Sequence, residues 1–268
     1  MANVIFLGTA GSSPVATKQF RASGGIIVQF EDLQFHLDPG PGALNKAKEY
    51  GINPHHTTAV LVSNSNLINC NDLNIVVEAM THSGIEHRGI VIGSKTVIGG
   101  TEEKQPYFTR FHQNMVEKMI PLKESHKVGI ELAQINALPV QHTDEHACGF
   151  KFLFPKFTLS YISDTKWSQE LMESVTGSDI LILNVPFPGG KGQGTQLDTE
   201  TAIKIISHVR PRVAIITHFG LEMLKANPLQ EAREVQRITG VQCIAAYDGL
   251  KISSSGFGAY KAPVRGFD

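Results

Sequence analysis

The sequence predicts a mixed α/β fold in which two β-sheets stack and helices cover both outer faces. Short apolar, β-rich runs bounded by Gly, Pro, Asn or Asp occur along the whole chain, which is typical of strands. Amphipathic stretches with apolar residues at three- and four-residue spacing fall between some of these runs, as in helices. Strand-rich sequence gives way to helix–strand alternation after Asp72, and the same change recurs after Ala137. Two such halves pack as two sheets with helices outside.

The expected elements follow one another in this order. Strands are expected at residues 4–7, 25–30, 34–37, 59–62, 89–92, 130–140, 150–154, 158–162, 180–184, 213–217 and 242–246. Helices are expected at residues 42–50, 72–82, 167–175, 198–208 and 228–239. No long linker separates the halves, so we expect one four-layer αββα domain over residues 1–268. The Gly-rich stretch at 189–195 lacks phosphate-loop spacing and is expected to be a mobile surface loop.

Composition excludes several classes of protein. The 268 residues are 41% hydrophobic, which is enough for a sizeable core. The formal net charge of −1 lacks the basic excess of a dedicated nucleic-acid binder. Cys70, Cys148 and Cys243 form no paired pattern, which favours a reducing compartment over a disulfide framework. With neither a signal peptide nor a run near the roughly 18 apolar residues that cross a membrane, we expect a cytoplasmic protein without a membrane partner.

Polar residues follow five of the expected strands. They are Asp38 in FHLDPGPG, Ser63 in AVLVSNSN, His142 in LPVQHTDEH, Asp164 in LSYISDT and His218 in VAIITHFG. Functional side chains gather on loops held by rigid sheets, so these strand ends are the candidate site. Two imidazoles and a carboxylate at separate strand ends resemble a converging set of metal ligands.

The motifs GTAGSSP, LDPGPG, DLN, SDT and THFG, in this order and with a His before SDT, resemble those of the metallo-β-lactamase superfamily. The resemblance extends from Phe6 to about Ile252 and is closest to the branch with ribonuclease Z and archaeal predicted metal-dependent hydrolases. It implies an αββα sandwich with a site at one edge. In that family a His-x-His-x-Asp-His stretch and three later ligands hold two metals, and the water between them becomes the nucleophile.

The ligands implied by the resemblance are only partly present. His142, Asp164 and His218 match the three later metal ligands, and Asp38 matches an Asp that supports the site. The His-x-His-x-Asp-His stretch is absent, and Ser63 stands in the position of the Thr that precedes it. The residues in its place are Asn64, Ser65, Asn66, Leu67, Ile68 and Asn69. Amide oxygens are much weaker zinc ligands than imidazoles, so this change argues against a dinuclear centre.

Several residues keep two interpretations. His142, Asp164 and His218 either bind a metal or form a remnant polar cluster satisfied by hydrogen bonds. Asn64, Asn66 and Asn69 line the pocket, either as weak ligands or, as we favour, as an amide network.

At the neighbouring positions we favour structural or solvent-facing roles over roles in the site. Asp38 is expected to organise a turn, Cys70 and Asp72 to start a helix, and Asp144 and His146 to face solvent. The alternatives are that Cys70 and Asp72 are substitute ligands and that Asp144 and His146 reach the site. The remaining histidines show no ligand spacing; they are His36, His55, His56, His82, His87, His112, His126 and His208.

The resemblance therefore implies a hydrolase-family protein with an altered centre. We expect one divalent cation, with zinc favoured, or none, and cleavage of a phosphodiester or another ester if the chain is an enzyme. Asp164 would hold the metal or orient water, and His142 and His218 would be ligands or acid/base groups. The alternative is a non-catalytic binding or interaction protein that keeps the fold and pocket. Relatives are commonly dimers, so a homodimer is expected by analogy.

Overall fold

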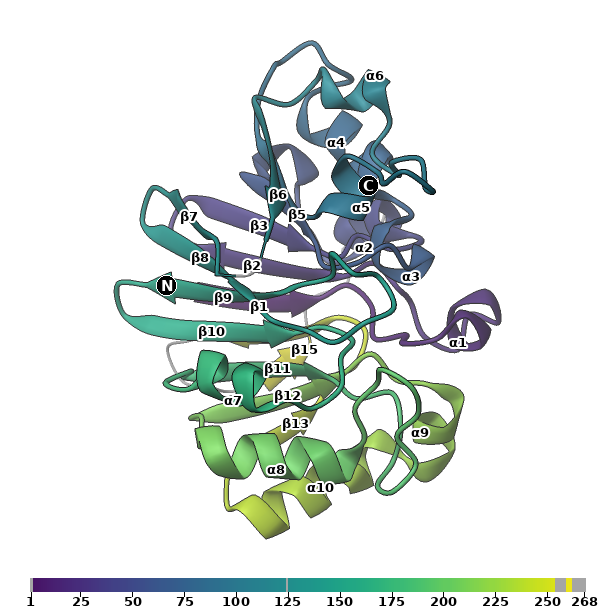
Figure 1. Ribbon diagram of the computed structural model, residues 1–268, viewed down its shortest axis with the longest axis vertical. Coiled ribbons are helices and arrows are strands. Elements are labelled where there is room, and N and C mark those ends of the chain that lie inside the picture. Colours follow the sequence, from purple (N-terminus) through teal and green to yellow (C-terminus); the bar gives the residue numbers. More distant parts are fainter. Residues whose placement is uncertain (1, 124, 254–258, 262–268) are drawn as a thin grey trace. The chain divides into compact units, whose positions relative to one another are not determined.

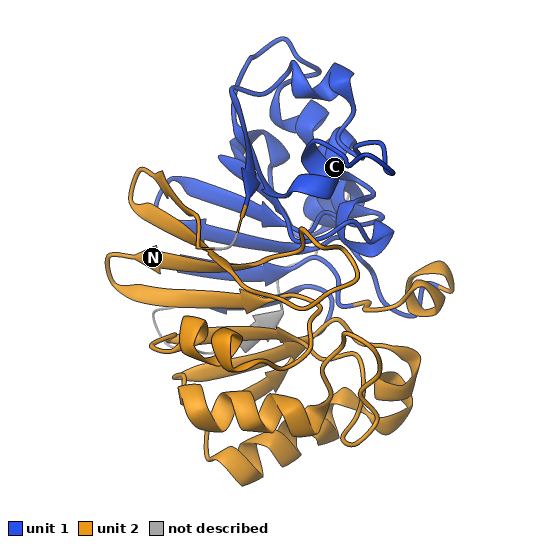
Figure 2. Ribbon diagram, in the orientation of Figure 1, with its two compact units in different colours: residues 1–9, 19–122, 247–268 blue, residues 10–18, 123–246 orange. Residues whose placement is uncertain are grey.

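The computed structural model describes residues 2–123, 125–253 and 259–261, the last three by their backbone only. The chain divides into two compact units, coloured separately in Figure 2. Unit 1 comprises residues 1–9, 19–122 and 247–268, and unit 2 comprises residues 10–18 and 123–246. Each unit contains one β-sheet with helices, which confirms the predicted mixed α/β class. The single domain over residues 1–268 stays a prediction.

Unit 1 contains an eight-stranded sheet in the described part of the chain, in the order β15-β14-β1-β2-β3-β4-β5-β6. Strands β1 to β3 are antiparallel neighbours, whereas β3 to β6 are parallel. The strands are β1 (Ala2–Phe6), β2 (Ile26–Phe30), β3 (Leu33–Leu37), β4 (Ala59–Val62), β5 (Ile90–Ser94), β6 (Lys118–Leu122), β14 (Leu250–Ser253) and β15 (Ala259–Lys261). The helices are α2 (Ala43–Glu49), η1 (Pro54–His56), α3 (Leu67–Cys70), α4 (Leu73–Met80), α5 (Lys95–Ile98) and α6 (Arg110–Gln113).

Helix α4 covers one face of the parallel strands of unit 1. Its apolar residues at helical spacing, Leu73, Val76, Val77 and Met80, are all fully buried. They share a core cluster with Val60 and Val62 of β4 and Val91 of β5. Strands β3 and β4 are buried along their whole length, as expected for parallel strands covered on both faces.

Unit 2 contains a seven-stranded sheet in the order β13-β12-β11-β10-β9-β8-β7 among its described residues. Strands β7 to β10 are antiparallel neighbours, and β10 to β13 are parallel. The strands are β7 (Lys127–Ile130), β8 (Ala133–Leu138), β9 (Gly149–Phe154), β10 (Phe157–Ile162), β11 (Ile180–Asn184), β12 (Val213–Thr217) and β13 (Cys243–Ala245). The helices are α1 (Ser13–Thr17), α7 (Gln169–Val175), α8 (Thr199–Val209), α9 (Leu221–Ala226) and α10 (Pro228–Thr239).

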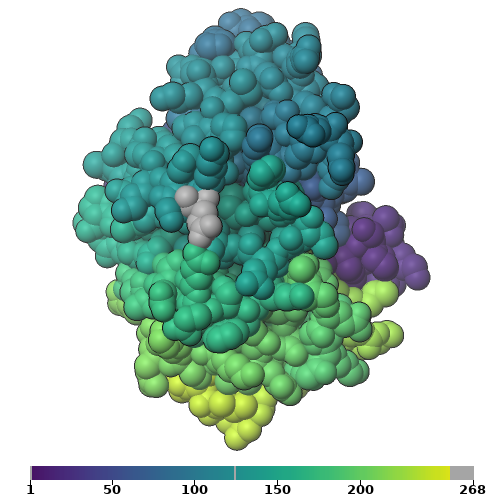
Figure 3. Space-filling model, viewed as in Figure 1, coloured from purple at the N-terminus to yellow at the C-terminus, as the bar shows by residue number. Residues whose placement is uncertain are grey.

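Helices α7, α8 and α10 lie on one side of the unit 2 sheet (Figure 1). They bury a cluster that includes Leu183 of β11 and Ile216 of β12. The short helix α1 packs through Val15 against Leu224 of α9. In Figure 3 this purple segment lies beside the yellow-green surface of the α9 region.

The predicted elements agree closely with the observed ones where apolar periodicity is strong. Strands β4, β11 and β12 and helix α10 have the predicted bounds. The prediction of one strand over residues 130–140 is wrong, because Glu131 adopts a positive φ of 47° and turns the chain between β7 and β8. Strand β6 was not predicted; its residues are mostly exposed, and it contains Pro121, which is unfavourable inside a strand. In the described residues, no helix has the length and apolar character needed to span a membrane.

Candidate functional site

Four polar side chains stand at one edge of the unit 2 sheet. Strands β8, β10, β11 and β12 run in the same direction, because β8 and β10 are both antiparallel to β9 and β10 to β12 are parallel. Their carboxyl ends therefore lie at the same edge. His142 follows β8, Asp164 follows β10, Asn184 ends β11 and His218 follows β12.

Asp164 is the buried centre of this group. Its Oδ1 lies 3.0 Å from Nδ1 of His218 and accepts a hydrogen bond from Nδ2 of Asn184 at 3.3 Å. Burial by itself would raise the pKa of the Asp164 carboxyl, but His218, His142 and Asn184 outweigh it and hold this pKa below its usual value. The second oxygen, Oδ2, is buried and accepts no hydrogen bond from the described residues. The carboxylate is therefore ionised and incompletely satisfied by the protein.

Asn184 is a residue that the sequence prediction missed. Its Nδ2 also donates to the hydroxyl of Tyr161 at 3.3 Å, and its side chain is buried. Its Oδ1 accepts no hydrogen bond in the described part of the chain. The sequence pattern could have indicated Asn184, since it is the polar last residue of an otherwise apolar strand.

His142 is oriented by the loop that follows it. Its Nδ1 accepts a hydrogen bond from the backbone N–H of Asp144 at 2.9 Å, so a neutral His142 carries its proton on Nε2. The Asp144 carboxylate accepts in turn from the N–H of His146 at 3.0 Å. Asp144 is 5% exposed, so the expectation that it faces solvent is wrong, because the turn folds its carboxylate inward.

The N-terminal GTAGSSP motif holds the backbone at His218. The Gly11 N–H donates to the carbonyl oxygen of Phe219 at 2.9 Å. A Cβ atom at Gly11 would lie 1.7 Å from the carbonyl oxygen of His218, so no other residue fits without a backbone shift. His218 itself has a positive φ of 61°. The glycine thus permits the close approach that places the histidine after β12.

In unit 1, Asp38 ties together the ends of the neighbouring strands β3 and β4. Its Oδ1 accepts from the Ser63 N–H at 2.6 Å and its Oδ2 from the Ser63 hydroxyl at 2.7 Å. Its carbonyl oxygen accepts from the Gly40 N–H, which closes the expected turn. Asp38 is therefore structural, although its side chain organises the adjacent strand end.

The segment that the resemblance aligns with the His-x-His-x-Asp-His stretch forms a network of hydrogen-bonded amides around the fully buried Asn64. Its Oδ1 accepts from the Asn66 N–H at 3.0 Å and from Nδ2 of Asn69 at 3.1 Å, while its Nδ2 donates to the Ser63 hydroxyl at 3.0 Å. A carbonyl oxygen has two lone pairs, and both are engaged. Asn69 is buried and Asn66 is exposed. Asn64 therefore has no remaining capacity as a ligand in this arrangement.

Cys70 and Asp72 do not extend this network. Cys70 is buried in the apolar cluster of α4. Asp72 stands at the N-cap of α4 as predicted, but its Oδ2 accepts from the N–H groups of Gly42 and Ala43, so its side chain caps α2 instead.

The structure thus brings the predicted residues together in two groups. His142, Asp164 and His218 share one edge in unit 2, and Asp38, Asn64, Asn66 and Asn69 lie at the strand ends of unit 1. That the two groups form one site stays a prediction. A different group in unit 1 has three potential ligand atoms within 4.8 Å of one another. In the part of the chain that the structure describes, this group consists of His55, His82 and Glu86.

Comparisons with known proteins agree with this architecture. A family model described as the beta-lactamase superfamily domain matches residues 34–219. The curated protein MJ1374 of Methanocaldococcus jannaschii, which is uncharacterized, is 31% identical over 251 residues, covering 93% of this chain and 94% of that protein.

Three solved structures share the fold at low sequence identity. The metallo-beta-lactamase fold protein YhfI from Bacillus subtilis has a TM-score of 0.77 and 17% identity, covering 93% of this chain and 98% of its own. A diphosphatase from the PhnP family has a TM-score of 0.69 and 16% identity, with 99% and 100% covered. Zn(2+)-bound PqqB from Methylobacterium extorquens has a TM-score of 0.66 and 15% identity, with 94% and 99% covered.

Proposed function

Because this chain belongs to the beta-lactamase superfamily, we propose that it is a hydrolase-type protein whose altered centre holds at most one divalent cation. The bond cleaved would be of the ester type, a phosphodiester or another small ester. A diphosphatase among the similar folds supports a phosphorus ester. The net charge of −1 favours a small substrate over a nucleic acid.

The hydrogen bonding of Asn64 is the observation that carries this proposal. The segment from Asn64 to Asn69 offers amides and Ile68 where a first metal site needs imidazoles and a carboxylate. The Asn64 oxygen is already engaged by two donors, so ligation would require the network to break. Two adjacent cations would also lack the negative charge that offsets their repulsion.

The unit 2 residues fit one cation better. Asp164 presents a buried, ionised carboxylate with one oxygen unsatisfied, and His218 stands beside its other oxygen. With His142 they would make a two-histidine, one-carboxylate set with zinc as the favoured occupant, once the three side chains close on one cation, since their ligand atoms are not all within 4.8 Å of one another. When bound, such a cation lowers the pKa of water and polarises the bond to be cleaved.

The chain's own residues prepare the reacting groups. The Asp164 carboxylate lies 3.0 Å from Nδ1 of His218, and Asn184 donates a hydrogen bond to it. In a metal-free centre His142 would instead contribute an Nε2–H donor while its Nδ1 accepts from the Asp144 N–H. These groups can hold and release protons during ester cleavage, which is general acid–base chemistry.

The arrangement of His142 also supports a second candidate, a non-catalytic binding protein. A neutral His142 with its proton on Nε2 cannot ligate through that atom without giving up the hydrogen bond from Asp144. A donor at this position suits an anionic ligand. In this alternative the fold and pocket are kept without turnover, and the protein would bind an anion or metabolite without zinc.

The decisive measurement is the number of metal ions per chain whose binding depends on Asp164. The untagged protein would be purified without chelator, loaded with zinc, dialysed and submitted to elemental analysis, alongside Asp164→Ala and the exposed control Asp32→Ala. We expect Asp164→Ala to bind either one ion fewer per chain than wild type or the same number. Asp32→Ala should bind the same number as wild type. A loss of two ions would refute the single-cation centre. One ion favours the hydrolase, and none together with anion binding favours the binding protein.

Catalysis is tested with a bis-aryl phosphate in added zinc or manganese. We expect turnover near background, because a second cation that would stabilise the attacking and leaving oxygens is missing. Robust turnover that Asp164→Ala abolishes would contradict the altered centre.

A further inference from the structure

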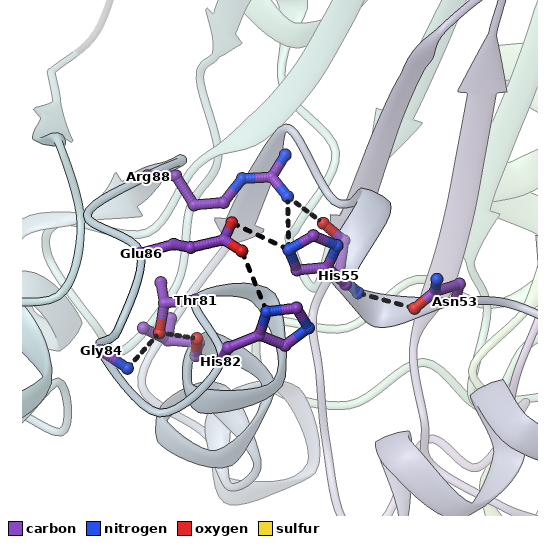
Figure 4. A network of polar contacts seen from close by, with 8 residues as sticks. Asn53, His55, Thr81, His82, Gly84, Glu86 and Arg88 are labelled. Carbon is purple, nitrogen blue, oxygen red and sulfur yellow. Dashed lines mark hydrogen bonds and ion pairs between the residues drawn. The ribbon is translucent and has the colours of Figure 1, made fainter.

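A second group of metal-ligating side chains lies in unit 1, on residues that the sequence pattern did not connect. His55, His82 and Glu86 converge in Figure 4, with the Glu86 carboxylate beside the two imidazoles. One Glu86 oxygen lies 3.0 Å from Nε2 of His55, and the other lies 3.0 Å from Nδ1 of His82. The two rings stack with their centroids 3.9 Å apart and an angle of 6° between their planes.

The local backbone holds the three side chains in place. His55 lies in the 3-10 helix η1, where its N–H donates to the Asn53 side chain at 3.1 Å. His82 follows α4 with a positive φ of 47°, in a turn where the Thr81 hydroxyl accepts from the Gly84 N–H at 3.1 Å. The sequence concealed the group because 26 residues separate His55 from His82, and only the fold of unit 1 brings them together.

Nε2 of His55 has conflicting neighbours. It lies 3.0 Å from an oxygen of Glu86, which requires a proton on Nε2, and 3.2 Å from Nη1 of Arg88, which requires a lone pair there. Neutral His55 satisfies only one of these contacts. Nη1 of Arg88 also donates to the His55 carbonyl oxygen at 2.5 Å, so Arg88 stays anchored when Nε2 engages elsewhere.

We propose that His55, His82 and Glu86 bind one divalent transition-metal cation of the zinc type, independently of the centre in unit 2. All three ligand atoms lie within 4.8 Å of one another. Neighbouring ligands of a tetrahedral zinc are about 3.3 Å apart, given zinc–ligand distances of about 2.0–2.1 Å. Each 3.0 Å contact needs to open only slightly, and the stacked imidazole rings, whose planes differ by 6°, must tilt so that both nitrogen lone pairs point at one cation. Imidazole and carboxylate together suit zinc, with water completing the coordination.

The same residues limit the affinity. The side chains of His55, His82 and Glu86 are 26%, 55% and 44% exposed, so water competes for the cation. Arg88 adds a positive charge next to Nε2 of His55. Removal of this charge should therefore strengthen binding.

The test counts zinc in protein that lacks the other centre. In an untagged Asp164→Asn background, freed of metal by chelation, zinc would be titrated in competition with a chromophoric chelator, and cobalt would report coordination by its visible absorption. We expect one zinc per chain. His82→Asn, whose new residue tolerates the positive φ, and Glu86→Gln should weaken it by more than about tenfold and remove the cobalt bands.

Two controls complete the design. The exposed neighbour His56 is outside the group, so His56→Asn should bind zinc as the background protein does, whereas Arg88→Gln should bind it more tightly. Circular dichroism would check that every variant is folded. Equal zinc affinity in the background protein, His82→Asn and Glu86→Gln would overturn the proposal. Because Asp164 is absent throughout, that result would leave the proposed function untouched.

Discussion

Lowering the pH from 7 to 5 is expected to destabilise the protein through one buried histidine, His36. It lies in β3, between β2 and β4, and is 2% exposed. Its Nε2 donates to the Gly24 carbonyl oxygen at 2.8 Å. Burial lowers the pKa of His36 from 6.5 to about 4, against smaller opposing effects of the Gly24 hydrogen bond and the Asp72 charge.

The sign and size follow from linkage. Below pH 6.5, His36 becomes protonated in the unfolded chain but stays neutral in the folded protein until the pH nears 4. This difference favours the unfolded chain. The free energy of unfolding is therefore highest with respect to this group above pH 6.5 and falls as the pH is lowered from 6.5 toward 4. At about 1.4 kcal/mol per pKa unit the full effect is about 3 kcal/mol. Between pH 7 and pH 5 the free energy of unfolding should fall by about 2 kcal/mol from this group.

Urea unfolding at the two pH values measures this effect. His36→Gln does not titrate, so its free energy of unfolding should change by about 2 kcal/mol less between pH 7 and pH 5 than that of wild type. Any constant cost of the substitution cancels in this comparison. The exposed control His126→Gln should follow wild type. If His36→Gln showed the wild-type pH dependence, the argument that burial keeps His36 neutral would be wrong.

Two further predictions concern the glycine and the carboxylate that hold the strand-end loops. Gly11→Ala should lower the free energy of unfolding, measured by thermal unfolding, by about 1–3 kcal/mol, because its Cβ would meet the His218 carbonyl oxygen. The control Gly129→Ala, whose Cβ would have nothing within 4 Å, should be nearly neutral. Equal effects of the two substitutions would contradict the close approach at Gly11. Asp72→Ala should lower the free energy of unfolding, measured in urea, by about 1–2 kcal/mol, because α2 loses its cap. If Asp72→Ala were no more destabilising than the exposed control Asp32→Ala, this capping role would be refuted.

The fold was largely predictable because its elements obey local periodicity. The apolar runs of β4, β11 and β12 and the amphipathic pattern of α10 specify their own bounds, since a strand buried on both faces and a helix with one buried face each leave a sequence pattern. The turn at Glu131 left no such mark, because it depends on one residue with a positive φ in an apolar stretch.

The sequence by itself also determined which residues stand at the strand ends. His142, Asp164 and His218 each follow a predicted strand, and the shared direction of β8, β10 and β12 places them at one edge of the unit 2 sheet. The absence of a His-x-His-x-Asp-His stretch is likewise evident from the sequence.

Only the tertiary structure decided how these side chains are satisfied. It showed that Asn184 donates a hydrogen bond to Asp164 and that Nδ1 of His142 accepts one from the Asp144 N–H. It also brought His82 to within stacking distance of His55, although 26 residues lie between them in the sequence. Periodicity reports which face of an element is buried, whereas a hydrogen bond or a shared ligand position depends on the direction of side chains from distant segments, and packing alone fixes that direction.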